Sequence, residues 1–289
     1  MKKALLLINK NSRKGKELIS KATTILQSMG FELIVKSTKH ADEIPVTIRL
    51  YKDQIELVII GGGDGTLNYA IEGLIDTKLP LGILPMGTAN DLARTLKIPT
   101  NLSAACQVIA NGNIRLIDLG WVNGQYFFNV ASLGLSVEIT QRLTKDAKQR
   151  WGILAYAVTA LRTIWASRPF RAEIKVNNQS FHVKTIQIAI GNGRYYGGGM
   201  TVAEDATIDD GRLDLYSLET QHWWEIIALL PSMRQGNHSV WKNVRDLRGQ
   251  EFEIYTTKPR PINTDGEITT YTPAKFRVIP KALAVIASA

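Results

Sequence analysis

Apolar and polar positions over the first 120 residues predict a layered α/β structure. Short runs of aliphatic and β-branched residues alternate with segments of helical spacing, which is typical of β-α-β units around a parallel sheet. Pro45 places the start of the second helix near itself, because proline is tolerated only in a helix's first turn. The expected strands are Ala4–Ile8, Glu32–Lys36, Leu57–Ile60 and Leu81–Leu84, and the expected helices cover about 15–29, 41–52 and 66–75, with another beginning near Asn90.

The pattern changes near Trp121. Short alternating runs separated by turns rich in Asn, Gly and Asp follow, and these are typical of antiparallel β structure. Helical spacing over about 148–166 and 223–234 interrupts them. The expected strands include Arg171–Val176, Phe181–Ile190, Leu213–Leu218 and Phe252–Thr256. We therefore expect an α/β domain over 1–122, a β-rich domain with helical inserts over 123–280, and a last strand over 281–289 that returns to the first domain.

Composition fits a soluble or peripheral protein. The chain has 289 residues, of which 45% are hydrophobic and 21% charged, and this size favours two domains. The apolar run after Met1-Lys2-Lys3 is too short for a signal peptide, and no stretch approaches the roughly 18 apolar residues of a membrane span. Cys106 is the only cysteine, so no internal disulfide can form, which fits a cytoplasmic protein.

The net charge of +9 suits nucleic acid, an anionic membrane surface or a polyphosphate ligand. Basic residues are scattered along the chain, and no zinc-finger or RNA-recognition signature is present. We therefore expect no nucleic-acid partner.

The segment Gly61–Thr66 predicts a phosphate-binding loop. It joins an expected strand to an expected helix, and its glycines let several N–H groups face an anion beside the positive end of the helix dipole. Asp64 lies in the same loop, where a carboxylate fits if a divalent cation bridges it to phosphate. The alternative is a tight turn with Thr66 as helix cap.

A second loop, Pro85–Asp91, follows the next strand and also runs into a helix. Asn90 or Asp91 in it can act simply as a helix cap. However, two adjacent strand ends that each carry a Gly-Thr pair and an aspartate are what a nucleotide-metal site needs. The first loop, Asn9–Gly15, adds amides, hydroxyls and positive charge at the same sheet edge, unless it is only a solvated turn.

Common nucleotide motifs do not fit. The spacing of a P-loop is absent, since Lys10 stands where its first glycine is required. The segment Gly191–Gly199 approaches a dinucleotide-binding pattern but lies in the β-rich half, and we interpret it as a glycine-dependent turn beside the cleft. Two acidic turns remain. Thr207–Asp214 is either a plain turn or a cation site, and Asn263–Glu267 is either a hairpin turn or a pair of catalytic carboxylates.

In this order and spacing, the motifs resemble the diacylglycerol kinase catalytic-domain family, especially its soluble bacterial lipid kinases, over almost the whole chain. The residues that carry the resemblance are Gly62–Thr66, Pro85 with Gly87-Thr88 and Asn90-Asp91, Asn192-Gly193 with Gly197–Gly199, Asp210-Gly211 with Leu213-Asp214, and Asp265–Glu267. The resemblance implies a Rossmann-like nucleotide-binding α/β domain and an antiparallel β-sandwich domain, with ATP between them. Glu204 departs from the family, which often has proline there.

The resemblance also implies residue roles. ATP would contact Asn9, Lys10, Asn11, Ser12, Arg13, Thr38, Gly63, Asp64, Gly65, Thr66, Leu67, Asn68, Tyr69 and Thr88. Either Glu267 or Asp265 would be the general base, and Asp64, Asp91 and Glu267 would organise catalytic Mg²⁺. A structural Mg²⁺ would be held by Thr207, Asp210 and Arg212, largely through backbone oxygens.

The implied reaction is transfer of the γ-phosphoryl group of ATP to a lipid hydroxyl, with diacylglycerol or a related glycerolipid as acceptor. The implied location is cytoplasmic with transient, peripheral membrane contact, and a homodimer is left open. Trp151, Trp165, Trp223 and Trp224 offer interfacial contact, although we expect most of them to pack in the core. The alternatives are an NAD kinase-like enzyme and a non-catalytic nucleotide-binding regulator.

Overall fold

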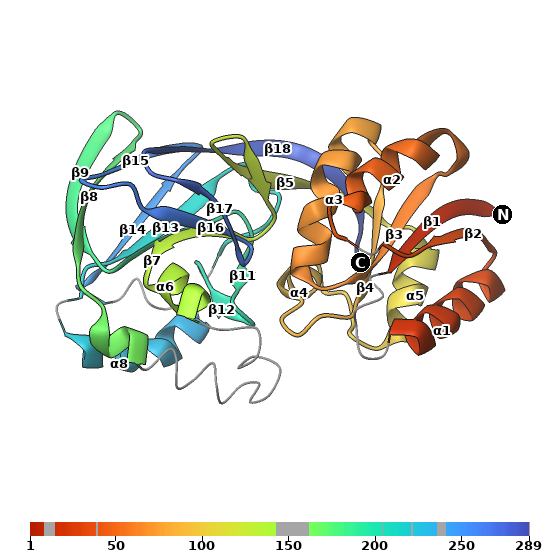
Figure 1. The fold of residues 1–289 in the computed structure, drawn as a ribbon, viewed down its shortest axis with the longest axis horizontal. Coiled ribbons are helices and arrows are strands. Elements are labelled where there is room, and N and C mark those ends of the chain that lie inside the picture. The colour runs from red at the N-terminus through yellow and green to blue at the C-terminus, as the bar shows by residue number, and fades with distance from the viewer. Residues whose placement is uncertain are drawn as a thin grey trace.

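The structure is a computed structural model that describes residues 1–8, 15–38, 40–142, 162–203, 205–220, 222–235 and 241–288. Two domains lie side by side, and long strands run between them (Figure 1). The first is a mixed α/β domain, and the second is built from antiparallel strands with helical inserts.

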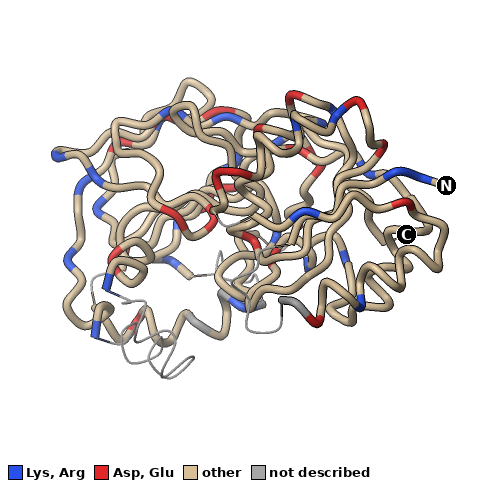
Figure 2. Tube along the Cα trace, turned by 45° about the vertical axis from the view of Figure 1, so that its right-hand side comes forward, with Lys and Arg blue, Asp and Glu red and all other residues tan. Residues whose placement is uncertain are grey.

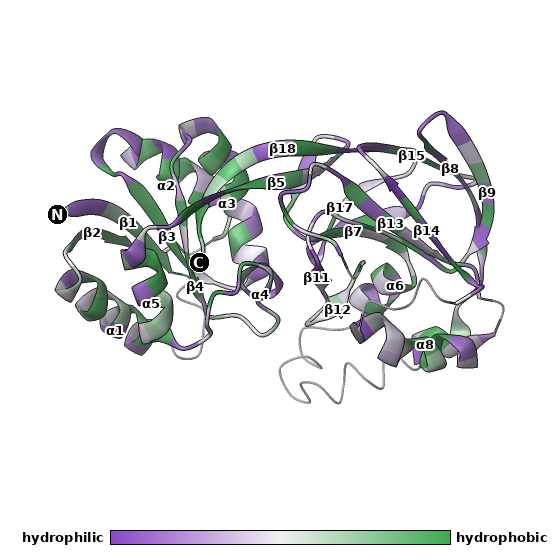
Figure 3. Ribbon diagram, turned by 180° about the vertical axis from the view of Figure 1, so that it is seen from behind, coloured by the Kyte–Doolittle hydropathy of each residue, from purple (hydrophilic) through white to green (hydrophobic). Residues whose placement is uncertain are grey.

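The first domain is centred on a parallel sheet with strand order β2-β1-β3-β4. Every residue of β3 is buried, as are the last five of β1, which is the burial expected of parallel strands covered on both faces. Helices α2 and α3 pack together on one face and α1 and α5 on the other (Figures 1 and 3). The elements are β1 (Lys2–Ile8), α1 (Gly15–Ser28), β2 (Phe31–Lys36), α2 (Glu43–Tyr51), η1 (Lys52–Gln54), β3 (Leu57–Gly62), α3 (Asp64–Thr77), β4 (Leu81–Pro85), α4 (Asp91–Thr95) and α5 (Leu102–Asn111).

The second domain contains two sheets. One continues from β4 through β18, β15 and β8 to β9, with β5 and β6 beside β18, and the other has the order β14-β13-β10-β7-β16-β17. A short hairpin, β11-β12, lies beside them. The strands are β5 (Ile114–Val122), β6 (Gln125–Phe127), β7 (Val130–Gly134), β8 (Phe170–Val176), β9 (Gln179–Thr185), β10 (Gln187–Gly191), β11 (Tyr195–Tyr196), β12 (Met200–Thr201), β13 (Leu213–Leu218), β14 (Val244–Gly249), β15 (Glu251–Thr256), β16 (Pro261–Thr264), β17 (Glu267–Tyr271) and β18 (Ala274–Ile286), and the helices are α6 (Leu135–Arg142) and α8 (Trp223–Gln235).

Strands β5 and β18 link the domains. They pair antiparallel along nearly their whole length, and Val285 near the end of β18 also pairs parallel with Leu81 of β4. The register shifts between Ile279 and Leu283, where Lys281 has a φ of 51°. The buried Asp118 of β5 braces this irregularity, since its carboxylate accepts hydrogen bonds from Lys281 N and Gly211 N, both at 2.7 Å.

Buried hydrophobic residues in the described ranges form three clusters. One fills the first domain, and the second lies between the two sheets of the second domain. The third lies between the helices α6 and α8 and the sheet with the order β14-β13-β10-β7-β16-β17. Helix α8 contributes Ile226 and Leu229 to the third cluster. These two residues, three positions apart, lie on its inward face. Trp223 and Trp224, in the first turn of the helix, are exposed.

The fold class predicted from the sequence is confirmed, and so are the four strands and three helices expected before residue 85. The single strand expected over Phe181–Ile190 is wrong, because the chain bends at Ile186 and enters a different sheet. Thr185 makes the bend: its hydroxyl donates to Gln187 O at 2.8 Å and accepts from Gln187 N at 3.2 Å. Side chain to backbone bonds of this kind compete with continued strand pairing.

Two further expectations concern the helical inserts. Of the helix expected over about 148–166, the structure describes only residues 162–166, which are helical. The expected core packing of most tryptophans is wrong for Trp165, Trp223 and Trp224, which are exposed, while Trp151 lies outside the described residues. No helix within the described ranges is both long and apolar enough to cross a membrane.

Candidate functional site

Three strand ends of the first domain meet at one edge of the sheet. Ile8 at the end of β1 pairs with Gly61, and Gly62 at the end of β3 pairs with Pro85 at the end of β4. Ligands bind at the carboxyl ends of the strands in open α/β sheets. The loops predicted from the sequence therefore begin next to one another.

The loops after β3 and β4 are in backbone contact, and only glycine fits where they meet. A Cβ on Gly87 would lie 2.4 Å from the Cα of Gly63 and 2.8 Å from Oδ1 of Asn90. Asn90 holds the second loop closed, because its side chain accepts from Gly87 N and donates to Gly87 O, both at 2.9 Å. The close approach leaves the two turns as one rigid unit.

Helix α3 begins at this contact without a side-chain cap. Its N-cap is Gly63, and Thr66, the cap expected under the alternative interpretation, instead lies against Gly62. A Cβ added to Gly65 would meet no atom within 4 Å, so the first turn of the helix faces open space. Uncapped N–H groups at a helix start favour an anion such as phosphate.

Asp64 and Asp91 lie at the centre of the site. Asp64, in the first turn of α3, accepts a hydrogen bond from Leu92 N at 3.0 Å and so caps the neighbouring short helix α4. Asp91 is buried, and desolvation together with the charge of Asp64 raises the pKa of its carboxyl group. Its Oδ2 accepts from Gly198 N at 2.9 Å, while Oδ1 is shielded from solvent without a hydrogen-bond partner among the described residues.

The bond from Gly198 ties the second domain to the first. Gly197, Gly198 and Gly199 all have positive φ, so this turn requires glycine. Beside it, the ring of Tyr195 faces two guanidinium groups, that of Arg94 from α4 at 5.8 Å and that of Arg194 at 5.4 Å. The turn expected beside the cleft from the sequence is therefore an interdomain contact.

Asp265 approaches the same site from the second domain. It lies with Gly266 in the two-residue turn between β16 and β17, and both have positive φ, as the Asp-Gly hairpin pattern predicts. Its carboxylate accepts hydrogen bonds from Phe128 N at 2.6 Å, Asn129 N at 3.0 Å and Val130 N at 3.1 Å. Desolvation, with a contribution from the charge of Asp64, raises its pKa to about 6.

Glu267 follows this turn and begins β17. Its side chain is exposed, in contrast to the fully engaged carboxylate of Asp265. The hairpin therefore presents one anchored and one accessible carboxylate, two residues apart.

The acidic turn at Thr207–Asp214 is held by arginine. Asp210 accepts from Thr207 N and Arg212 N, both at 3.3 Å, and lies 3.2 Å from Nε of Arg212. Asp205 binds the guanidinium groups of Arg212 and Arg248. The three residues predicted for a structural Mg²⁺ are thus neighbours, with an arginine as the observed charge partner of Asp210.

The structure brings some predicted residues together and leaves others apart or outside its range. Gly63, Asp64, Gly65, Thr66, Asp91 and Asp265 gather at the domain junction, with Thr88 exposed on the second loop and Leu67, Asn68 and Tyr69 in the first turns of α3. Thr38 is buried just beyond β2. Asn9, Lys10, Asn11, Ser12, Arg13 and Glu204 lie outside the described residues. Within the described ranges, no three or more His, Cys, Asp or Glu side chains form a cluster that would hold a metal ion.

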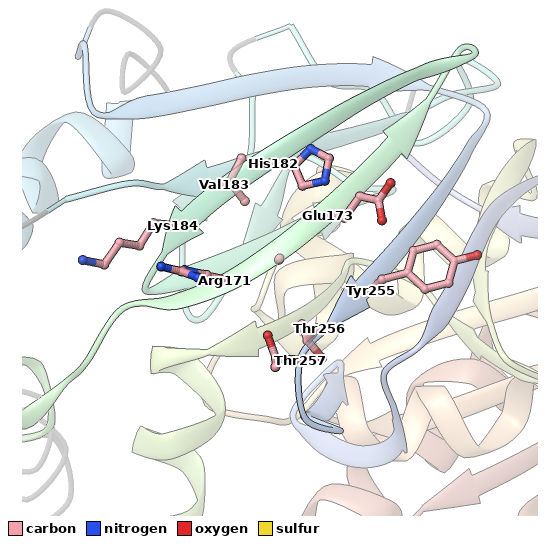
Figure 4. A pocket seen from close by; sticks show the side chains of 9 residues that line it. Arg171, Glu173, His182, Val183, Lys184, Tyr255, Thr256 and Thr257 are labelled. Atoms are coloured by element: carbon pink, nitrogen blue, oxygen red, sulfur yellow. The ribbon is translucent and has the colours of Figure 1, made fainter.

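Figure 2 shows acidic segments near the middle of the molecule, where the two domains meet. A pocket of about 490 Å³ lies elsewhere, on the outer surface of β8, β9 and β15, and Arg171, His182, Lys184 and Tyr255 are among its lining residues (Figure 4). This pocket is open to solvent and far from Asp64, Asp91 and Asp265, so we do not assign the reaction to it.

Two buried residues, one in the strands that link the domains and one at the site, carry no motif that the sequence analysis used. Asp118 braces the β5-β18 irregularity, as described above. Asn129 offers its backbone N–H to Asp265, and Oδ1 of its side chain is buried without a hydrogen-bond partner among the described residues. A single Asp or Asn inside a strand pattern gives no signal in one sequence, because its partners come from distant segments.

The chain matches two family models that together cover nearly all of it. Residues 3–122 match the family described as "Diacylglycerol kinase catalytic domain", and residues 129–287 match "YegS C-terminal NAD kinase beta sandwich-like domain". The boundary between the matches falls near the change of pattern seen in the sequence.

Individual proteins with similar sequences or structures belong to the same group of kinases by name. Diacylglycerol kinase of Bacillus subtilis (strain 168) is 30% identical over 284 residues, which cover 96% of this chain and 93% of that protein. A candidate lipid kinase of Staphylococcus aureus (strain JH9) is 26% identical over 285 residues. The crystal structure of a candidate diacylglycerol kinase from Bacillus anthracis str. Sterne has the same fold, with a TM-score of 0.86 over 99% of this chain and 95% of that one at 24% identity.

Proposed function

The chain belongs to the diacylglycerol kinase catalytic-domain family, and from this premise we propose that it transfers the γ-phosphoryl group of ATP to the hydroxyl group of diacylglycerol, with Mg²⁺. The enzyme class, a phosphotransferase of the lipid kinase type, is that of the family. The nucleotide, the metal and the acceptor are the proposed parts.

One observation carries the proposal. Carboxylates from both domains gather beside an uncapped helix start, close enough that the charge of Asp64 adds to desolvation in raising the pKa of both Asp91 and Asp265. Such a concentration of negative charge is unfavourable in the protein alone. It is favourable when a divalent cation and a phosphate chain lie between the carboxylates and the helix start.

The first turn of α3 is the proposed phosphate site. Its N–H groups are uncapped, and the space in front of Gly65 is open. The contact between Gly63 and Gly87 fixes the two loops, so these groups are oriented before ligand binds. Preorganised donors of this kind stabilise the charge that spreads over the transferring group.

The acidic residues suit a magnesium ion that is held through water rather than by a cluster of direct ligands. Mg²⁺ prefers carboxylate and water oxygens, and Oδ1 of Asp91 is a buried carboxylate oxygen without a hydrogen-bond partner among the described residues. We propose that Asp64, Asp91 and Glu267 hold the ion through water. When bound, the ion neutralises phosphate charge. We also propose that Thr207, Asp210 and Arg212 form the structural cation site.

Glu267 is the proposed general base. Asp265 already accepts three backbone N–H groups, so its carboxylate is committed to fixing the hairpin against β7. Glu267 is exposed and two residues away, which leaves it free to accept the proton of an acceptor hydroxyl. Asp265 therefore acts as a positioning residue.

The test is a transfer assay with ³²P-labelled ATP. Diacylglycerol, phosphatidylglycerol, a sphingoid base and NAD are offered side by side, each with and without Mg²⁺. We expect labelled product from diacylglycerol in the presence of Mg²⁺. Product from NAD alone would favour an NAD kinase-like enzyme, and no product from any acceptor would favour a non-catalytic nucleotide-binding protein.

A further inference from the structure

Exposed tryptophans gather at one end of the second domain. Trp165 is 73% exposed, Trp224 55%, Trp223 47% and Trp241 36%. Tryptophan is a residue that proteins normally bury to a large extent, and a group of exposed ones marks an interaction surface. We call these four residues the tryptophan face.

Packing places the four residues close together. Ile164, the neighbour of Trp165, belongs to the same buried cluster as Ile226 and Leu229 of α8, and Trp223 and Trp224 begin that helix. In Figure 1 the segment 162–166 lies beside α8 at the lower end of the domain.

Two interactions hold parts of this face. Nε1 of Trp241 donates to Oγ of Ser232 in α8 at 3.2 Å. The ring of His222 stacks on that of Trp224, with centroids 5.9 Å apart and an interplanar angle of 9°. Two of the four side chains, those of Trp224 and Trp241, are therefore held by contacts at the surface.

The charge around the tryptophan face is positive. Arg162, Arg168 and Lys242 are exposed within three positions of a tryptophan, and Arg234 is exposed in the last turn of α8. Glu225 is the one acidic residue in the described ranges 162–168, 222–235 and 241–242, and its carboxylate accepts a hydrogen bond from His222 N.

We propose that the tryptophan face docks on the surface of an anionic lipid bilayer. This inference deepens the proposed function and rests on it for its purpose, since a lipid kinase must meet its acceptor at a membrane. Indole rings favour the region between headgroups and acyl chains, and basic side chains beside them are attracted to anionic headgroups. Exposed indole rings and the exposed basic residues of the same segments match this boundary in both its apolar and its charged layer.

The test is binding of the full chain to sedimenting vesicles without ATP. Vesicles of phosphatidylcholine alone are compared with vesicles that also contain phosphatidylglycerol. We expect the wild type to bind the anionic vesicles, with affinity that falls as salt rises. The Trp165→Ala/Trp223→Ala/Trp224→Ala variant should lose at least about tenfold in affinity, and Arg234→Gln or Lys242→Gln about fivefold each, on anionic vesicles only.

The matched control is Tyr255→Ala, an exposed aromatic residue on the outer face of β15. It should bind vesicles like the wild type. Equal vesicle binding by the triple variant and the wild type would overturn the proposal. The proposal would also be overturned if the wild type sedimented as a dimer and the triple variant as a monomer, because the tryptophan face would then be an interface between copies.

A second readout separates this proposal from the proposed function. Transfer to a short-chain diacylglycerol in detergent micelles needs no bilayer docking, so the triple variant should retain wild-type rates there and lose them on vesicles. Loss in both assays, with native circular dichroism, would place the tryptophans in the reaction site instead and overturn docking. A wild type that binds vesicles but transfers phosphate to no lipid would refute the proposed function and leave docking supported.

Discussion

At the scale of single residues, the two carboxylates of the β16-β17 hairpin have opposite environments. Asp265 accepts three backbone N–H groups, whereas Glu267 is exposed. Chemically similar groups two positions apart are therefore expected to have different roles, one in stability and one in the reaction.

The Asp265→Ala variant should be destabilised, because three partly buried amides lose their acceptor. We expect a loss of about 3 kcal/mol in the free energy of unfolding, measured by urea denaturation. The Glu267→Gln variant should unfold within about 0.5 kcal/mol of the wild type but transfer phosphate about 10²–10⁴-fold more slowly. The reverse pattern would make Asp265 the base.

Cys106 should be inert in the native protein. It is fully buried in α5, and desolvation raises the pKa of its thiol from 9.0 to about 11. An aromatic disulfide reagent at pH 8 should therefore react only after denaturation, since the thiolate is the reactive form. Rapid labelling of the folded chain would contradict this burial.

The same shift gives a pH dependence of stability. The unfolded chain loses the thiol proton near pH 9 and the folded chain near pH 11, so the native state binds more protons between these values. Unfolding free energy should fall as pH rises through this window, by up to about 3 kcal/mol. Comparison of the wild type with the Cys106→Ser variant isolates this contribution. The difference between their free energies of unfolding should narrow from pH 9 to pH 11.

At the scale of elements, the back-to-back glycine loops are the feature on which the site depends. The sequence identified both loops as strand-to-helix turns with phosphate chemistry, because glycine density and strand ends are local signals. That Gly63 and Gly87 touch, and that Asp64 caps α4 rather than its own helix, depends on the pairing of β3 with β4 and is not readable from one segment.

A matched pair of glycine variants tests this contact. Gly87→Ala places a Cβ 2.4 Å from the Cα of Gly63. The variant should lose about 1–3 kcal/mol in the free energy of unfolding, and its ATP affinity should fall as well. Gly65→Ala meets no atom within 4 Å, and alanine suits a helix better, so its stability should be unchanged or about 1 kcal/mol higher. Its ATP affinity should nevertheless fall. Thermal unfolding and calorimetric titration measure both quantities.

At the scale of the whole molecule, the alternation of apolar runs was enough to predict two domains of different class, and the fold agrees. Features that depend on contacts between segments distant in the sequence could not be predicted from this pattern. Phe181–Ile190 was expected to be one strand because apolar alternation continues through Ile186, whereas Thr185 bends the chain into a second sheet. Most of the tryptophans were expected to pack in the core, but Trp165, Trp223 and Trp224 are exposed, while Ile226 and Leu229 of α8 are buried.

The connection between the domains depends on Asp118. Its two oxygens accept from Lys281 N of β18 and Gly211 N, so Asp118→Asn would direct an amide donor at one of these N–H groups. We expect a loss of about 1–3 kcal/mol in stability and faster hydrogen exchange in β18 and in the 205–211 turn. Exchange that rises equally throughout the first domain would contradict a local brace.

The central claim is that carboxylates from both domains and the start of α3 form a site for phosphoryl transfer from ATP to diacylglycerol. The most direct measurement is the single-turnover transfer rate from ³²P-labelled ATP to diacylglycerol for the wild type and Glu267→Gln, with MgATP affinity measured in parallel. We predict transfer by the wild type, and for the variant a single-turnover rate at saturating MgATP that is lower by about 10²–10⁴-fold. Equal rates in a folded Glu267→Gln protein, or no transfer by a wild type that binds MgATP, would contradict it.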